Sequence, residues 1–270
     1  DFITLKDGRV AFVYTHFTDG ADDFSEAHLA ARFSSDGGKT WTAEDVEILP
    51  NEGGHNVMSV SLLRLQDERI ALLYLRKNGD DECMPHLRYS SDEMATWTEP
   101  ILCVPSRPGY YVVNNDRLVQ LRSGRLVIPA ALHALKGDEF RSRAEAMCLL
   151  SDDGGATWRF SKSTLHAPEE VETGLQEPGI VELPGGRLWM FCRTSAGFQF
   201  SSWSEDGGDI WTDPVVSDIA SPTSPATVEV IPGTPHLLMA WNNHYGVTAE
   251  LKGRRTPFTL AISKDEGRTW

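Results

Sequence analysis

The 270-residue chain has little positive charge, few cysteines and no long apolar run. Its 25 lysines and arginines are outnumbered by 39 aspartates and glutamates, and the formal net charge is −14. Because this charge repels polyanions at long range, we expect neither a nucleic-acid partner nor binding to an anionic membrane surface. An anionic small substrate remains compatible with the sequence where a local cluster of arginines overrides the overall field.

No apolar run reaches the roughly 18 residues that a membrane-spanning segment needs, so the sequence predicts no membrane insertion. No signal-peptide pattern opens the chain. The compartment of this soluble protein stays undetermined, with a secreted or periplasmic location left open.

The four cysteines, Cys83, Cys103, Cys148 and Cys192, form no CxxC pair and stand mostly among apolar residues. This pattern is typical of buried free thiols rather than of a disulfide framework or a metal site. The histidines show no HxxxH or HExxH spacing. We therefore expect no metal and no cofactor.

The most regular feature of the sequence is one eight-residue pattern that occurs five times. The copies read SSDGGKTW at 34–41, SSDEMATW at 90–97, SDDGGATW at 151–158, SEDGGDIW at 204–211 and SKDEGRTW at 263–270. Their aspartates are separated by 56, 61, 53 and 59 residues, at Asp36, Asp92, Asp153, Asp206 and Asp265. A near-constant period of this size indicates a repeat fold.

Each octet follows three short apolar segments, as in SLLRLQDER, IALLYL and HLRYS before the second copy. A more polar segment follows the octet, for example EDVEIL after the first copy. Four short strands joined by hairpins and repeated radially describe the blades of a β-propeller. Because helical periodicity is weak, the sequence predicts an all-β chain. We expect one propeller domain over 1–270, with blades at roughly 1–50, 51–105, 106–168, 169–220 and 221–270.

The octets themselves are expected to be structural turns. The aspartate can accept hydrogen bonds from backbone N–H groups of its own loop, the glycine allows a positive φ, and the tryptophan buries a large ring. Two copies deviate, with Met94 in place of the glycine and Ile210 in place of the threonine.

The chain begins on the inner strand of the first blade and stops at Trp270, before the outer strand of the fifth. Because a propeller closes by joining its ends, we expect a fragment of a six-bladed ring that is incomplete at both termini.

The octet S-x-D-x-G-x-T-W resembles the Asp-box, or bacterial neuraminidase repeat. The chain resembles the sialidase superfamily of six-bladed propellers over nearly its whole length. Asp-boxes also occur in propellers with other activities, so the function must rest on the site.

The resemblance implies three arginines that hold a substrate carboxylate, a tyrosine nucleophile paired with a glutamate, and an aspartate acid/base. Guanidinium groups suit this substrate because they bind carboxylates bidentately. A neutral tyrosine avoids repulsion between an anionic nucleophile and an anionic sugar.

The segment QEPGIVELPGGRLWMFCRT matches the family stretch in which the glutamate opens one strand and an arginine closes the next. The resemblance assigns these roles to Glu177 and Arg193. In RRTPFTLAISKDEGRTW, Arg255 precedes the octet's serine by eight residues, as the family's third arginine does. Its neighbour Arg254 leaves the register ambiguous.

The loop THFTDGADDFSEAHLAARFSSDGG resembles the one that carries the aspartate acid/base. Asp23 is the better match and Asp22 the alternative. The first arginine would lie just upstream of Asp1, and the tyrosine nucleophile would lie beyond Trp270. Three tyrosines of the chain occupy other blades or positions and are not assigned this role: Tyr110, Tyr111 and Tyr245.

Further polar side chains stand where strand ends face the mouth of a propeller. Candidates for contact with sugar hydroxyls or carboxylates are Asn114, Asn115, Arg117, His55 and His133. The asparagines and Arg117 are the favoured members of this group.

Three functions are consistent with these residues. The first is a sialidase-type glycoside hydrolase that releases a terminal anionic sugar from a carbohydrate or glycoconjugate. The second is a propeller glycosidase or lyase on another acidic sugar, with His55, His133 or His244 as acid/base. The third is a non-catalytic carbohydrate- or protein-binding propeller. The combination of Glu177, Arg193 and Arg255 favours the first.

Overall fold

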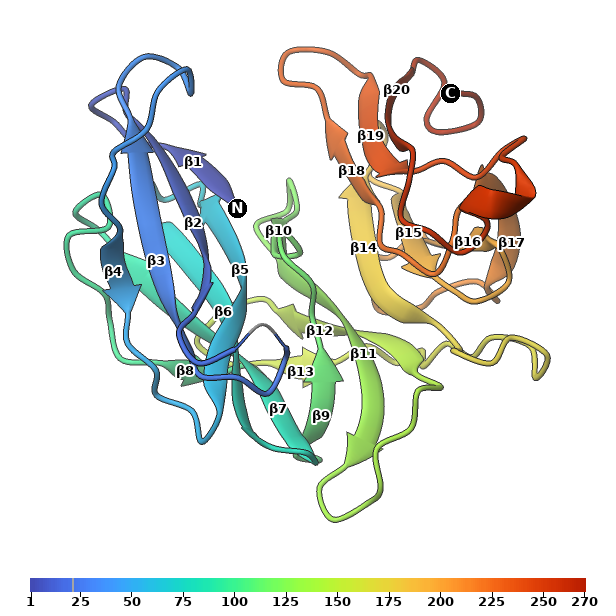
Figure 1. Cartoon of the computed structure of the whole chain (residues 1–270), viewed down its shortest axis with the longest axis horizontal. Coiled ribbons are helices and arrows are strands. Elements are labelled where there is room, and N and C mark those ends of the chain that lie inside the picture. Colours follow the sequence, from blue (N-terminus) through green and yellow to red (C-terminus); the bar gives the residue numbers. More distant parts are fainter. Residues whose placement is uncertain (21) are drawn as a thin grey trace.

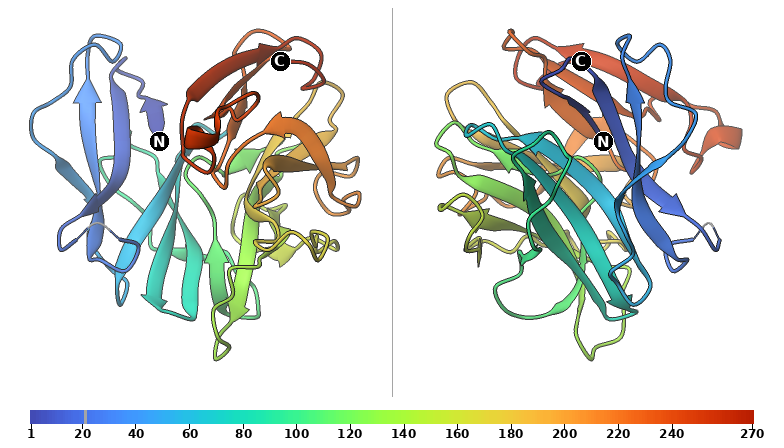
Figure 2. Two further views of the ribbon diagram at one scale, coloured as in Figure 1. Left: turned by 45° about the vertical axis from the view of Figure 1, so that its right-hand side comes forward. Right: turned by 90° about the vertical axis from the view of Figure 1, so that its left-hand side faces the viewer.

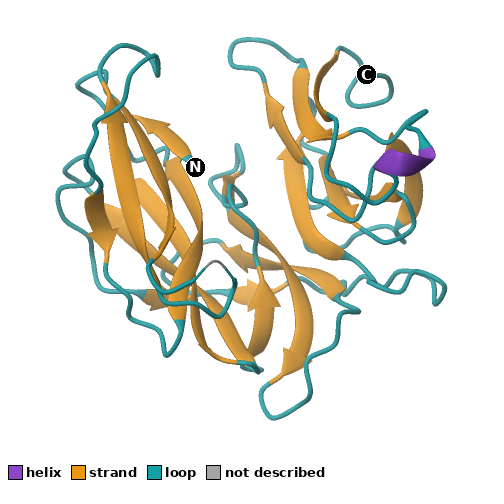
Figure 3. Cartoon of the chain, viewed as in Figure 1, coloured by secondary structure: helices purple, strands orange, loops and turns teal. Residues whose placement is uncertain are grey.

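A computed structural model describes residues 1–20 and 22–270. Strands form nearly all of the regular structure, and the one helical element of these residues is the 3-10 turn η1 (Ala249–Leu251) (Figure 3). The prediction of an all-β chain is confirmed. None of the helical structure found in the described ranges is long and apolar enough to cross a membrane.

The strands pair in five successive antiparallel groups, which we call units 1 to 5. Unit 1 contains β1 (Phe2–Thr4), β2 (Val10–Phe17), β3 (Ala27–Ser34) and β4 (Val46–Leu49). Unit 2 contains β5 (Asn56–Arg64), β6 (Ile70–Gly79), β7 (Glu82–Ser90) and β8 (Ile101–Leu102). Unit 3 contains β9 (Gly109–Val112), β10 (Val119–Gln120), β11 (Leu126–Leu135), β12 (Glu145–Ser151) and β13 (Arg159–Phe160). Unit 4 contains β14 (Gln176–Glu182), β15 (Leu188–Arg193), β16 (Phe198–Ser204) and β17 (Val215–Ala220). Unit 5 contains β18 (Thr227–Val230), β19 (Leu237–Asn242) and β20 (Phe258–Ser263).

The five units follow one another along an arc (Figure 1). Single parallel pairs, Ala27 with Asn56 and Cys83 with Tyr110, link units 1, 2 and 3 into one 13-stranded sheet. Units 4 and 5 form separate sheets of four and three strands, and no sheet of the described residues closes on itself. Unit 1 and unit 5 lie on the two sides of the open part of the arc (Figures 1 and 2).

Apolar cores lie between successive units because both faces of each inner sheet are covered. In β6, Ile70 and Leu72 pack toward unit 1, whereas Leu73 and Leu75 pack toward unit 3. Successive side chains of a strand point to opposite faces, which explains why β6 is apolar at every position from 70 to 75 rather than at alternate ones. The stacked cores hold the inner strand ends in fixed relative positions.

The octets form turns closed by their own aspartates. In the first copy, Ser34 Oγ donates to Asp36 Oδ1 at 2.8 Å, and Thr40 donates its backbone N–H at 2.9 Å and its hydroxyl at 2.7 Å to the same carboxylate. Trp41 Nε1 donates to the Gly38 carbonyl at 3.1 Å. The serine, N–H and hydroxyl bonds recur in the second, third and fifth copies. The predicted closure of each turn by its aspartate is confirmed.

The two deviating octets keep the turn by different means. Met94 adopts a positive φ of 73°, which glycine provides at the equivalent positions, and its buried side chain joins the core between units 1 and 2. Ile210 is 54% exposed, and its backbone N–H donates to Asp206 without a hydroxyl bond in addition. The four cysteines are all buried and free, as predicted.

Several apolar side chains are exposed on units 1 and 5, the two units beside the open part of the arc (Figure 1). They include Phe2 on unit 1 and, on unit 5, Leu238, Leu260 and Ile262. Exposed apolar surface on this scale is typical of a face that another segment covers.

Candidate functional site

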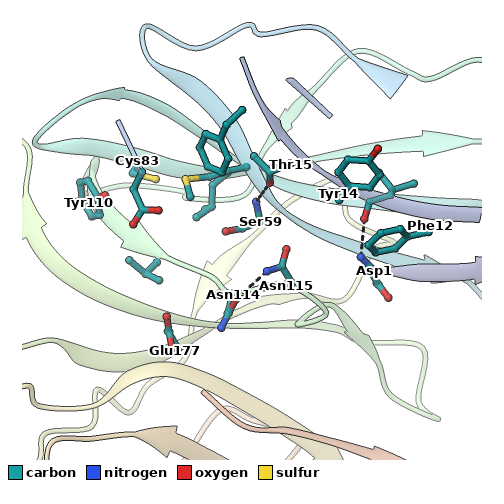
Figure 4. Close-up of a pocket in the computed structure, with 16 residues that line it drawn as sticks. Asp1, Phe12, Tyr14, Thr15, Ser59, Cys83, Tyr110, Asn114, Asn115 and Glu177 are labelled. Carbon is teal, nitrogen blue, oxygen red and sulfur yellow. Dashed lines mark hydrogen bonds between the residues drawn. The ribbon is translucent and has the colours of Figure 1, made fainter. Parts of the chain in front are cut away.

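A cavity of about 560 Å³ in the described part of the chain is lined by units 1 to 4 (Figure 4). Its polar lining residues are Asp1, Tyr14, Thr15, Asp23, Ser59, Tyr110, Asn114, Asn115 and Glu177. Its apolar lining residues are Phe12, Val13, Phe17, Met58, Leu75, Cys83 and Val112. The cavity thus brings together residues separated by more than 150 positions in the sequence, and carboxylates from units 1 and 4 share its wall.

Glu177 and Arg193 form an ion pair at the edge of this cavity. Glu177 is the second residue of β14 and Arg193 the last of β15, and their Oε1 and Nη1 atoms are 2.9 Å apart. A register shift between Gln176 and Gly179 brings the two ends together. A side chain on Gly179 would collide with Phe191, since an added Cβ would lie 2.3 Å from its ring. The sequence QEPG therefore allows β14 to pass close to β15.

Each member of this pair keeps one free polar atom. Glu177 Oε2 and Arg193 Nε are buried and have no hydrogen-bond partner among the described residues. The Glu177 backbone has a φ of 44°, in the region that favours glycine. Such strain costs about 1–3 kcal/mol and persists where the surroundings fix the residue, often at functional sites.

Asp23 lies on the cavity wall, in the loop between β2 and β3. Its neighbour Asp22 is bonded within the loop. Asp22 Oδ1 accepts hydrogen bonds from the Phe24 N–H at 2.9 Å and from Ser25 Oγ at 3.1 Å. These bonds lower the pKa of the Asp22 carboxyl and close a local turn. Of the two alternatives in the sequence, the structure places Asp23 at the cavity.

Asn114 and Asn115 also line the cavity, in the loop after β9. Asn114 Oδ1 accepts hydrogen bonds from the backbone and side-chain amides of Asn115, at 2.7 and 3.2 Å. Asn115 Oδ1 accepts from the Val60 N–H at 3.0 Å and so ties unit 3 to unit 2. In the view of Figure 4, both asparagines stand between Glu177 and the Ser59 region.

Arg117 does not line the cavity, and we correct its expected role. It is 2% exposed, and its guanidinium donates to the carbonyls of Asn115, Asp116 and Ala226 at 3.1, 3.1 and 2.8 Å. The carbonyl of Ala226 belongs to the segment that enters unit 5. Arg117 therefore links units 3 and 5 instead of facing a ligand.

The two histidine candidates also lie outside the cavity lining. His55 packs edge-on against Phe24, with ring centroids 5.9 Å apart. His133 is 7% exposed, stacks on Phe140, and places Nδ1 2.8 Å from the Arg141 carbonyl. Burial lowers the pKa of His133, which favours its neutral form. His133 lines a separate cavity of about 180 Å³.

Arg255 lies in the exposed loop between η1 and β20, outside the cavity lining. Its role in binding a substrate carboxylate remains a prediction.

Sequence reasoning missed Thr15, Ser59 and Met58 as cavity residues. Ser59 sits at an irregularity of β5 with a φ of 61°, and its N–H donates to Thr15 Oγ1 at 3.3 Å. Nothing in the residue pattern marks this irregularity. Tyr110 also lines the cavity, and its burial raises the pKa of its hydroxyl.

A family model described as a BNR repeat-like domain matches residues 43–270. The anhydrosialidase of Macrobdella decora is 26% identical over 234 residues, which cover 82% of this chain and 29% of that protein. The sialidase of Micromonospora viridifaciens is 25% identical over 300 residues, which cover 98% of this chain and 43% of that protein. The chain thus spans less than half the length of each of these curated relatives.

Two solved structures show the same fold. The Hadza microbial sialidase Hz136 superposes with a TM-score of 0.77 at 20% identity, covering 100% of this chain and 56% of that one. The Trypanosoma rangeli sialidase superposes with a TM-score of 0.72 at 16% identity, covering 97% of this chain and 46% of that one. The match over residues 43–270 shows that the chain belongs to the BNR repeat-like domain family, and the two solved structures show that it shares the fold of these sialidases.

Proposed function

We propose that this chain forms part of a sialidase-type glycoside hydrolase, which releases a terminal anionic sugar such as sialic acid from a glycoconjugate. The observation that carries the proposal is one cavity of about 560 Å³ whose wall holds Asp23 and Glu177, with Arg193 2.9 Å from Glu177. The relatives named sialidase and anhydrosialidase support the same class of activity.

In this proposal Asp23 is the acid/base that protonates the leaving group. Glu177 accepts the proton of a tyrosine nucleophile, which the sialidase pattern places after the fifth octet. Arg193 holds the substrate carboxylate, because its Nε is free of protein partners and a guanidinium can bind a carboxylate bidentately. Asn114 and Asn115 offer amide groups to sugar hydroxyls. Arg255 remains a candidate for a second arginine that binds the substrate carboxylate.

We further propose that a sixth unit closes the ring between units 5 and 1. The exposed apolar side chains Phe2, Leu260 and Ile262 support this proposal, since a sheet packed against them would remove them from water.

The histidine-based alternative gains no support from the cavity, because none of His55, His133 and His244 lines it. A non-catalytic binding propeller remains the alternative that an absence of turnover would favour.

The test is the turnover of a natural sialoside with a poor leaving group, 3′-sialyllactose, by the full-length protein and by Asp23→Ala, Glu177→Ala and Arg193→Ala. Loss of a catalytic acid or base lowers kcat/KM by about 100-fold to 10,000-fold. We expect losses in this range for all three variants. Asp153→Ala, which removes a turn carboxylate outside the cavity, should lower the melting temperature and leave kcat/KM within about twofold. Normal turnover in the three site variants would refute the site assignment.

A further inference from the structure

Lys77, near the end of β6, is a lysine with no exposed surface. Lysines are almost never fully buried unless they are paired. Among the described residues, no carboxylate lies within ion-pair distance of Lys77. Its ammonium instead donates to the main-chain carbonyl of Asp23 at 3.0 Å and lies 3.2 Å from the ring centroid of Phe24. The cation is therefore committed to the loop that carries Asp23.

Asn56, the first residue of β5, is also fully buried and faces the same loop. Its Nδ2 donates to the carbonyls of Asp23 and Ser25, each at 2.9 Å. Asn56 and Lys77 are direct partners in the β5–β6 pairing, so their side chains act from one point of unit 2. The Asp23 carbonyl thus receives two donors from a neighbouring unit.

These contacts differ from the loop's own closing bonds. Within unit 1, the Thr18 N–H donates to the Glu26 carbonyl at 2.9 Å, and Asp22 closes its local turn. Neither of these bonds fixes the main chain of Asp23 relative to units 2 and 3, which also line the cavity. That link comes from Asn56 and Lys77.

We propose that Asn56 and Lys77 form a clamp that fixes the Asp23 loop to unit 2 and so positions the Asp23 carboxyl in the cavity. The catalytic consequence of the clamp depends on the proposed function. Asn56 and Lys77 are positioning residues in this proposal, because they reach the main chain of Asp23 and the substrate is contacted by Asp23 itself.

Burying the Lys77 ammonium costs free energy, and the groups around it offset part of that cost. An ammonium removed from water is costly unless polar groups replace its hydration. Burial lowers the pKa of Lys77, and the nearby Cys83, Asp23, Asp80 and Asp22 oppose that shift. The carbonyl of Asp23 and the ring of Phe24 stabilise the charged form, together with Tyr110, whose ring centroid is 5.2 Å from Nζ. An apolar residue at 77 would avoid this cost but would release the loop.

The variants that test the clamp are Lys77→Met and Asn56→Asp in the full-length protein. Each keeps the approximate size of the side chain and removes its donors toward the loop. The control is Arg64→Met, because Arg64 also links units 1 and 2, through the Thr4 carbonyl and Glu93, away from the cavity. Should Lys77→Met fail to fold, Asn56→Asp carries the test alone.

The first readout is amide hydrogen exchange of residues 18–26. We expect exchange to be at least about tenfold faster in both clamp variants and unchanged in Arg64→Met, since the loop loses its fixed attachment. Unchanged exchange of 18–26 in the folded clamp variants would overturn the proposal.

The second readout compares a natural sialoside, 3′-sialyllactose, with a 4-methylumbelliferyl sialoside. A poor leaving group needs the general acid more than a good one does. We expect kcat/KM to fall by about 100-fold on the natural sialoside and by less than about tenfold on the umbelliferyl substrate. Equal losses on both substrates would indicate a merely structural role and overturn the positioning claim.

The two proposals fail in different ways. If the wild-type protein cleaves neither sialoside, the proposed function is wrong, and hydrogen exchange alone decides the clamp. Faster exchange in the clamp variants alone would still support the attachment of the loop to unit 2, and unchanged exchange would refute it.

Discussion

Glu177 combines three features that rarely occur in one glutamate. Its backbone φ is 44°, its side chain is 18% exposed, and its Oε1 lies 2.9 Å from Arg193. A glutamate free to choose its conformation avoids this region of backbone space. The ion pair and the register shift in β14 supply the constraint that keeps it there, and the residue lines the cavity.

Glu177→Gln should lower kcat/KM on a sialoside by about 100-fold or more, because the amide cannot act as a base and leaves Arg193 without a counter-charge. The melting temperature should fall by only a few degrees. Steady-state kinetics and thermal unfolding followed by circular dichroism measure the two effects.

A matched control is Glu266→Gln. Glu266 also has a positive φ, of 62°, and pairs with an arginine, Arg187, at 3.6 Å, but it does not line the cavity that Glu177 lines. We expect unchanged kcat/KM for this variant. Equal losses in the two variants would mean that the effect of Glu177→Gln is structural.

At the scale of single residues, strand-end position predicted the meeting of Glu177 and Arg193, because β14 and β15 are neighbours in the sequence. The same reasoning misplaced Arg117. A sequence cannot tell whether an arginine ahead of a strand turns toward a cavity or toward the carbonyl of Ala226, 109 residues away. The sequence likewise gives no sign that Lys77 is buried, and only the fold shows it.

Among the structural elements, the octet turns are the most regular, because each is closed by the same local hydrogen bonds. Each aspartate gathers hydrogen bonds from a serine, from backbone N–H groups and, in four of the copies, from a threonine hydroxyl. The turn needs little from the rest of the chain, which is why its chemistry could be predicted from eight residues. The cavity depends on contacts between units, and no local pattern contains that information.

The fourth octet offers a stabilising substitution. Ile210 is 54% exposed and has no hydroxyl, so Ile210→Thr should restore the bond to Asp206 that the other copies make. A hydrogen bond to a charged group contributes about 1.5–3 kcal/mol, and less at an exposed site, so we expect about 0.5–1.5 kcal/mol of added stability. Urea unfolding measures it, and a loss of stability would contradict the account of the turn.

The turns also predict how stability depends on pH. Hydrogen bonds within the octets lower the pKa of Asp36, Asp153 and Asp265 from 3.8 to about 2. A carboxyl whose pKa is lower in the folded state stabilises the fold fully above its unfolded value and loses this contribution as the pH falls toward the folded value. The free energy of unfolding should therefore decline between about pH 4 and pH 2.

Asp153→Asn tests this origin. The variant should be less stable than the wild type at pH 5 and should show a smaller decline between pH 4 and pH 2, because one titrating group has been removed. Unfolding curves in urea at several pH values provide the comparison. An unchanged pH dependence would assign the decline to other carboxyls.

At the scale of the whole molecule, the units form an arc with apolar faces at its open side. Ring closure by a sixth unit would bury Ile262, which is 51% exposed, whereas Ile210 on an outer turn has a similar exposure of 54%. In the full-length protein, Ile262→Glu should cost more than about 2 kcal/mol, since it would bury an unpaired carboxylate. Ile210→Glu should change stability by less than about 0.5 kcal/mol. Equally small effects would contradict closure at this face.

The arc also explains how units 1 and 4 supply one site. We propose that Asp23 and Glu177 act together in the cavity that they both line. The most direct test is a double-mutant cycle on the turnover of a sialoside, with Asp23→Asn, Glu177→Gln and the combined variant. Groups that act as one catalytic unit are strongly non-additive. The account predicts that kcat/KM of the double variant is little lower than that of the less active of the two single variants. If the two single losses simply multiply in the double variant, the account is contradicted.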